Sequence, residues 1–274
     1  MRKLFVIGIG AGHPDHLTIQ AIKAMNAVEV FFFPDKGEIK QDLLLRRRSI
    51  CQSYVAERNY KIVEIADPVR DEKVASYTTR VEQWHEQRVI LYEESISTEL
   101  KDGASGAFLV WGDPMLYDST LRILARIAAR KQVTIEYEVI PGITSLQALA
   151  AAHKTPLNEI GESIRITTGR LFDQQQLNRG ETVAVMLDGN CAFRGIQDAD
   201  TEICWGAYVG TEREILVSGR LGDVGGEIEQ VRARARSEHG WIMDCYLLRR
   251  AKASVAKDTH EPGRPDKPGP KPDL

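Results

Sequence analysis

Five short apolar runs separated by helical patterns dominate the first half of this 274-residue chain. The runs cover residues 3–9, 28–33, 61–65, 107–111 and 133–140, and they are nearly continuous in apolar residues, as in strands buried on both faces of a parallel sheet. Apolar residues at helical spacing occur at residues 17–28, where Pro14-Asp15 marks the start, at 74–91, and at 121–128, where Asp118-Ser119 precedes them as a cap. This alternation predicts a doubly wound, mostly parallel α/β sheet over residues 1–140.

The second half contains more strand-like runs and fewer helices. The runs cover residues 163–168, 182–187, 201–209, 214–217 and 241–249, and one long helix is expected near residues 227–238. With so few crossover helices some strands must pair antiparallel, so we expect a second α/β domain with a mixed sheet over residues 141–252. Residues 253–274 hold five of the 11 prolines and almost no large apolar residue, which predicts a disordered tail.

The composition excludes several classes of protein. Thirty-six basic and 39 acidic residues give a net charge of −3, so no global field attracts nucleic acid or anionic lipid. No apolar run approaches the roughly 18 residues that a membrane span needs. The four cysteines are scattered and form no CxxC motif, which argues against both a disulfide framework and a zinc site. We therefore expect a cytoplasmic protein with reduced thiols, no metal, and no nucleic-acid or membrane partner.

Three segments combine a strand, a turn and a helix start, and each has both a ligand-binding and a local structural explanation. Residues 6–14 form a glycine-rich loop that resembles a dinucleotide fingerprint, but its third glycine comes one residue early. Residues 108–118 end a strand in Gly-Asp-Pro, where Asp113 either accepts hydrogen bonds from a ligand or starts a turn. Residues 138–150 contain a Pro-Gly turn, after which Thr144 or Ser145 either contacts a ligand or caps a helix.

Together these segments resemble the tetrapyrrole methyltransferases, a family that includes the uroporphyrinogen-III, precorrin and cobalt-precorrin methyltransferases. The resemblance extends over about residues 1–250. It rests on Gly8, Gly10, Gly12, Leu17 and Thr18; on Gly112, Asp113, Pro114 and Tyr117; on Val139, Pro141, Gly142, Thr144 and Ser145; and on Gly210, Thr211, Glu214 and Ile215. Two positions depart from many relatives: Ala11 stands where they have proline, and Trp111 where they have glycine.

The resemblance implies S-adenosylmethionine bound in a trough between two α/β domains, a tetrapyrrole substrate, and a homodimer. Transferred by motif position, the cofactor-binding residues are Trp111, Gly112, Asp113, Leu116, Thr144, Ser145, Leu187, Gly210 and Met243. The glycine loop, which faces the substrate in this family, implies substrate contacts at Gly10, Ala11, Gly12, His13 and Pro14.

Longer motifs at residues 111–124, 205–208 and 240–250 are most similar to the family member that methylates C-1 of precorrin-5 and releases acetate. Acetate release calls for a base or an activated water. The candidates are His13, Asp15, His16, Asp35 and Asp113, and the sequence does not rank them.

The acidic side chains of such a substrate also call for cations. Arg46-Arg47-Arg48, Arg170 and Arg213 are candidates, although the triplet is equally typical of a solvated helix face. Two alternatives for the whole chain stay open: a sibling methyltransferase that acts at another ring carbon, and a regulatory module that senses a dinucleotide.

Overall fold

The computed structural model describes residues 1–35, 37, 41–57, 59–68, 76–173, 177–198 and 200–250. The predicted tail at 253–274, and Val74 at the start of the second predicted helical stripe, lie outside these residues.

The first half folds around a sheet of five parallel strands in the order β3-β2-β4-β1-β5. The strands are β1 (Arg2–Gly8), β2 (Val30–Asp35), β3 (Lys61–Ala66), β4 (Ser105–Val110) and β5 (Ile135–Ile140). The helices are α1 (Ile19–Met25), α2 (Gln41–Tyr54), α3 (Tyr77–Glu99) and α4 (Thr120–Arg130). The five expected strands and their parallel pairing are confirmed.

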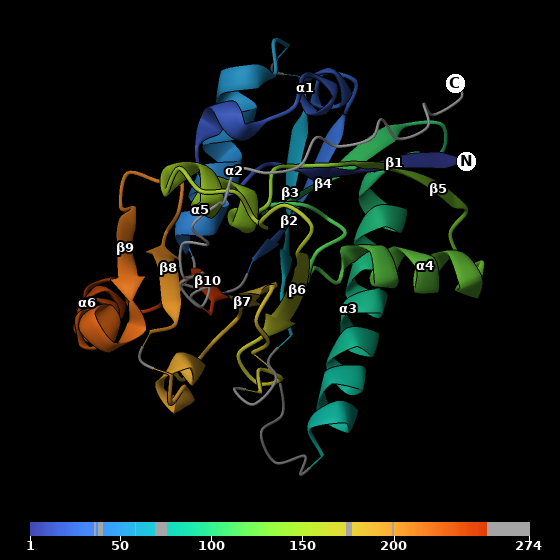
Figure 1. Ribbon diagram of the computed structural model, residues 1–274. Coiled ribbons are helices and arrows are strands. Elements are labelled where there is room, and N and C mark those ends of the chain that lie inside the picture. The colour runs from blue at the N-terminus through green and yellow to red at the C-terminus, as the bar shows by residue number, and fades with distance from the viewer. Residues whose placement is uncertain are drawn as a thin grey trace, which may run out of the picture.

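Both faces of the central strands β1, β2 and β4 are covered, which explains why these strands are almost continuously apolar, whereas the edge strands β3 and β5 also contain exposed charged residues. Phe31 and Phe33 of β2 pack with α1 and α2 on one face, whereas Phe32 packs with α3 on the other. Figure 1 shows α1 and α2 on one side of the sheet and α3 and α4 on the other. Since neighbouring residues of a strand point to opposite faces, a doubly covered sheet needs apolar residues at every position.

The second half folds around a mixed sheet in the order β6-β7-β10-β8-β9. The strands are β6 (Ser163–Thr168), β7 (Glu181–Met186), β8 (Glu202–Ala207), β9 (Ile215–Arg220) and β10 (Asp244–Arg249). Only β6 and β7 pair in parallel, and the other pairs are antiparallel, as the shortage of helices predicted. The helix α5 (Ser145–Ala152) packs on one face and α6 (Leu221–His239) on the other (Figure 1). The domain boundary between residues 140 and 141 stays a prediction.

Two of the expected helix starts differ from the observed ones, and a third agrees. Pro14–His16 forms a separate 3-10 turn, and α1 begins at Ile19 because the Thr18 hydroxyl accepts the Ala21 N–H (3.0 Å). The cap expected at Asp118-Ser119 is confirmed, since α4 begins at Thr120, whose N–H donates to the Asp118 carboxylate (2.7 Å). The last helix begins at Leu221, six residues before the expected start, and three glycines in its first six residues (Gly222, Gly225 and Gly226) weaken the helical pattern there. No helix within the described ranges is long and apolar enough to cross a membrane.

Candidate functional site

The three glycine-containing segments meet where β1, β4 and β5 end. Gly112 N donates to Gly10 O (2.8 Å), which joins the first two segments in an antiparallel bridge. A Cβ atom on Gly8 would lie 2.6 Å from the backbone nitrogen of Gly142, closer than real Cβ contacts allow. The glycines of the first and third segments are therefore required for backbone packing, whatever ligand they serve.

Asp113 holds the ends of β4 and β5 together by hydrogen bonds, and we call this arrangement the Asp113 clamp. Its side chain is 7% exposed, and its two carboxylate oxygens accept the backbone N–H groups of Met115 and Gly142, each at 2.8 Å. The two backbone donors thus give both oxygens of this buried side chain a hydrogen-bond partner. Asp113 thus ties the end of β4 to the end of β5, so its position in the pocket wall is fixed by the fold.

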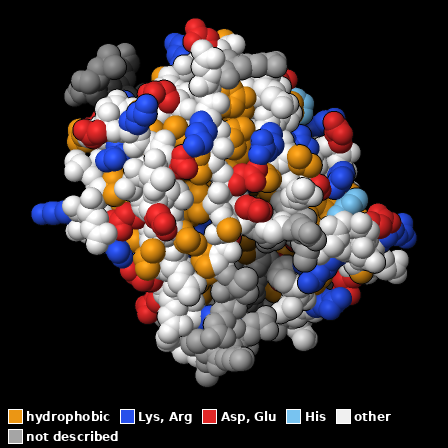
Figure 2. All heavy atoms as spheres, turned by 180° about the vertical axis from the view of Figure 1, so that it is seen from behind, with side chains coloured by type: hydrophobic (Ala, Val, Ile, Leu, Met, Phe, Trp, Pro, Cys, Tyr) orange, Lys and Arg blue, Asp and Glu red, His pale blue; other side chains and the backbone are white. Residues whose placement is uncertain are grey.

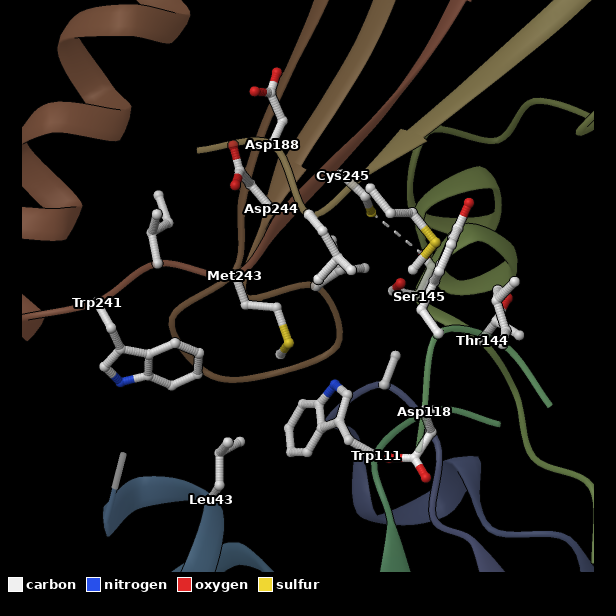
Figure 3. A pocket seen from close by; sticks show the side chains of 18 of the residues that line it. Leu43, Trp111, Asp118, Thr144, Ser145, Asp188, Trp241, Met243, Asp244 and Cys245 are labelled. Atoms are coloured by element: carbon white, nitrogen blue, oxygen red, sulfur yellow. Dashed lines mark hydrogen bonds between the residues drawn. The ribbon is translucent and has the colours of Figure 1, made fainter. Parts of the chain in front are cut away.

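A pocket of about 650 Å³ lies beside this junction, between the two sheets. Figure 3 shows its side chains converging from segments of both halves of the chain. Eight of the nine predicted cofactor-binding residues line it: Trp111, Gly112, Asp113, Leu116, Thr144, Ser145, Leu187 and Met243. Thr144 also caps α5, where its hydroxyl and the Gln147 side chain form a reciprocal pair of hydrogen bonds with the backbone. The ninth residue, Gly210, lines a separate cavity.

The predicted substrate loop divides between two cavities. Ala11 lines the main pocket, whereas His13 and Pro14 line the separate cavity of about 670 Å³ that includes Gly210. Gly10 and Gly12 are buried against His16 and Thr211.

Three of the five candidate bases, His13, Asp15 and His16, lie next to one another, whereas Asp35 and Asp113 lie elsewhere. His16 lies beside His13, and its pKa is lowered, mainly by burial and also by His13. Asp15 accepts a hydrogen bond from Tyr54 OH (2.9 Å) at the surface. Asp35 accepts the Gly37 N–H (2.9 Å) and lies outside the cavities found among the described residues. No base is assigned on this geometry.

Two residues of the main pocket have strained backbones. Tyr117 (φ 53°) and Leu187 (φ 51°) are non-glycine residues in the left-handed region. Leu187 nevertheless leaves 64% of its surface exposed, so core packing does not explain the strain. Strain of this kind is commonly retained at binding sites.

A charged cluster of Asp188, Arg232 and Asp244 lies at one end of the pocket and was not predicted from the sequence. Asp244 accepts hydrogen bonds from Arg232 Nε (2.8 Å) and Trp205 Nε1 (3.0 Å), while Asp188 accepts one from Tyr246 OH (2.7 Å). Burial raises the pKa of Asp244, and the hydrogen bond from Arg232 opposes that rise. Asp188 follows the end of β7 and Asp244 begins its antiparallel neighbour β10, so only the pairing of these strands brings them together. The sequence feature that could have pointed to this cluster is an aspartate beside an apolar strand, as at Asp188 and Asp244.

The arginine triplet at residues 46–48 is interpreted from the sequence either as a set of substrate-binding cations or as a solvated helix face. Arg48 pairs with Glu64 at the surface, but Arg47 is 6% exposed and lines the main pocket, so a solvated face is wrong for this residue. Of the other candidate cations, Arg213 pairs with Asp42 (2.6 Å) beside a smaller cavity. Because the sequence of α2 has little amphipathic pattern, it did not indicate which of the three arginines points inward.

Two α/β units that share a ligand-sized pocket, at the carboxyl ends of the parallel strands in the first unit, define a small-molecule enzyme or binding protein of the α/β class. Residues 3–225 match the family model of the Tetrapyrrole (Corrin/Porphyrin) Methylases, and the chain belongs to this family.

The individual relatives agree with this assignment. A Sinorhizobium sp. protein named precorrin-6A synthase [deacetylating] is 51% identical over 250 residues, covering 91% of this chain and 96% of that protein. A crystal structure from Corynebacterium diphtheriae, described as a cobalamin synthesis related protein (CobF), is 38% identical with a TM-score of 0.78, covering 91% and 99% of the two chains. A uroporphyrin-III C-methyl transferase from Thermus thermophilus, complexed with S-adenosyl homocysteine, shares the fold at 17% identity and a TM-score of 0.56, covering 90% and 92%.

Proposed function

We propose that this chain is an S-adenosylmethionine-dependent methyltransferase of cobalamin biosynthesis that methylates precorrin-5 at C-1 and releases acetate, giving precorrin-6A. The observation that carries the proposal is the 51% identity to a precorrin-6A synthase along nearly the full length of both chains. The match to a CobF structure over 91% of this chain supports it.

The pocket fits S-adenosylmethionine in size and chemistry. Its volume of about 650 Å³ falls in the range typical of sites for small organic ligands. Leu116, Met186, Leu187 and Met243 offer apolar surface for an adenine ring, while Thr144 and Ser145 offer polar groups for the amino-acid end. Bound there, this cofactor would supply an activated methyl group on a sulfonium.

The contribution of the protein to methyl transfer is positioning. A nucleophilic ring carbon must lie in line with the methyl group, and correct orientation is worth about 7–11 kcal/mol in favourable cases. The glycine junction, the Asp113 clamp and the strained Leu187 fix the pocket walls before ligand arrives. Trp111 and Trp241, on segments from the two halves of the chain, add broad apolar surfaces for a macrocycle (Figure 3).

Assembly and location belong to the same proposal. A homodimer is consistent with exposed apolar residues that include Ile160, Ile164 and Ile166, and Figure 2 shows apolar side chains gathered across one face between charged ones. We also propose a cytoplasmic location, where the four cysteines, three of them buried, would remain reduced.

The direct test is an anaerobic incubation of the protein with S-adenosylmethionine and enzymatically generated precorrin-5. We expect a gain of one methyl group per macrocycle by mass spectrometry and one equivalent of acetate. Methylation of an earlier precorrin with no turnover of precorrin-5 would move the activity to a sibling step. Calorimetric titration with S-adenosyl homocysteine and with NAD separates both from a dinucleotide sensor, which would bind only NAD.

A further inference from the structure

Arg47 is a buried cation without a buried anion. Its Nε donates to Leu109 O (2.8 Å) and its Nη1 to Leu43 O (3.3 Å), and both acceptors are backbone carbonyls. Within the described part of the chain no carboxylate lies within ion-pair distance of it, and no hydrogen bond uses Nη2. Burial lowers the pKa of Arg47, but an arginine remains protonated at neutral pH. The pocket therefore contains one guanidinium edge that is still available to an acceptor.

Trp111 adds a second unused donor to the same wall. Its indole Nε1 is buried and has no hydrogen-bond partner among the described residues. In Figure 3 the indole points into the pocket toward Met243. A buried indole N–H is normally paired, since leaving it unpaired costs the desolvation of the donor. Trp111 and Arg47 both line the main pocket, Trp111 directly after β4 and Arg47 hydrogen-bonded to that strand at Leu109.

We propose that Arg47 and Trp111 form a subsite that binds an oxygen anion of the tetrapyrrole substrate. The inference rests on the proposed function for the identity of the substrate. A guanidinium edge combined with an N–H donor matches a carboxylate or a polarised acyl oxygen, and a ligand of this kind satisfies both unused donors. The charge of Asp118, which also lines the pocket, raises the pKa of Arg47 against the larger lowering by burial, but one Asp118 oxygen is occupied by the Thr120 N–H (2.7 Å), and the two side chains lie beyond ion-pair distance among the described residues.

Two oxygens of a precorrin have this chemistry: a carboxylate of an acidic side chain, and the acetyl oxygen that leaves in acetate. The first would be held equally in the bound substrate and in the transition state. The second would gain charge only as the acetyl group is cleaved. The two sources therefore separate in steady-state kinetics, because uniform binding changes KM whereas transition-state stabilisation changes kcat.

The test uses Arg47→Lys, which keeps the charge and loses the planar fork, and Trp111→Phe, which keeps a ring and loses the N–H. Arg126→Lys, on the exposed surface of α4 near Glu86, is the matched control. We expect all three variants to bind S-adenosyl homocysteine within about twofold of wild type, because the family resemblance implies that the backbone of Trp111, and not its indole, contacts the cofactor. Arg47→Lys should reduce kcat/KM for precorrin-5 by about tenfold or more and Trp111→Phe by about threefold to tenfold, in line with charged and neutral hydrogen bonds.

A rise in KM at constant kcat identifies a side-chain carboxylate, and a fall in kcat at constant KM identifies the acetyl oxygen. Wild-type kinetics in both variants would overturn the subsite. The subsite would also be overturned if the variants lost affinity for S-adenosyl homocysteine by the same factor as they lose kcat/KM, because the two donors would then bind the cofactor.

A binding measurement that needs no turnover separates this inference from the proposed function. Uroporphyrin III, a stable macrocycle with eight carboxylates, is titrated into the protein saturated with S-adenosyl homocysteine. Weaker binding to Arg47→Lys than to Arg126→Lys supports the subsite even if precorrin-5 proves not to be the substrate. Equal affinity of the two variants, together with unchanged kinetics on any accepted precorrin, refutes it.

Discussion

Replacement of Asp113 by alanine removes the clamp between the ends of β4 and β5. The carboxylate accepts two backbone N–H groups at 2.8 Å and is almost fully buried. A hydrogen bond to a charged group contributes about 1.5–3 kcal/mol, so loss of both should lower the free energy of unfolding by about 3–6 kcal/mol. Asp113→Asn retains the shape and one acceptor oxygen but turns an amide NH2 toward the other donor, so we expect about half of that loss.

The clamp should also affect ligand affinity, because Gly112 and Thr144 stand on the two loops that it joins and both line the pocket. Urea unfolding followed by tryptophan fluorescence gives the stability, and calorimetric titration with S-adenosyl homocysteine under folding conditions gives the affinity. We expect both quantities to decrease in the order wild type, Asp113→Asn, Asp113→Ala. Asp223→Ala, an exposed acidic residue in the first turn of α6, should cost less than about 1 kcal/mol.

Two results would refute this reasoning. Wild-type stability of Asp113→Ala would mean that the two hydrogen bonds do not hold the strand ends together. A large loss of stability with unchanged affinity of the folded protein would mean that the clamp supports the fold without shaping the pocket.

Three further predictions concern single positions. Gly142→Ala should destabilise the protein severely, because the new Cβ would lie 2.8 Å from Gly8 Cα. Gly226→Ala in α6, where a Cβ meets no other atom within 4 Å, should raise the free energy of unfolding by about 0.5–1 kcal/mol. Urea titration of both variants measures the difference. Leu187→Gly should relieve the positive φ and stabilise the chain by about 1 kcal/mol, yet weaken S-adenosyl homocysteine binding in calorimetry; tighter binding would contradict a role in the pocket wall. The lowered pKa of His16 means that the unfolded chain binds a proton more readily than the folded one, so stability should fall as pH decreases through 6.5, and urea titrations from pH 7 to 5 should show a smaller fall in His16→Gln.

The strand order could be anticipated only in part. Short apolar runs identified the five strands of the first sheet and their parallel pairing, and the pattern is clearest in β1, β2 and β4, because these central strands are buried on both faces. The order β3-β2-β4-β1-β5, and the five-strand order of the second sheet, depend on contacts between distant segments that leave no periodic signal.

The sequence by itself determined the class of the fold, the family, and the glycine and Asp113 positions around which the pocket forms. These are requirements of short segments, such as turn geometry, close backbone approach and the alternation of buried strands, and residue types report them directly. Only the tertiary structure decided that Arg47 is the buried member of its triplet, that Asp188 and Asp244 meet beside Arg232, and that Gly210 faces a different cavity from Leu187. Each of those outcomes depends on which element packs against a residue from far along the chain, and local sequence carries no record of that partner.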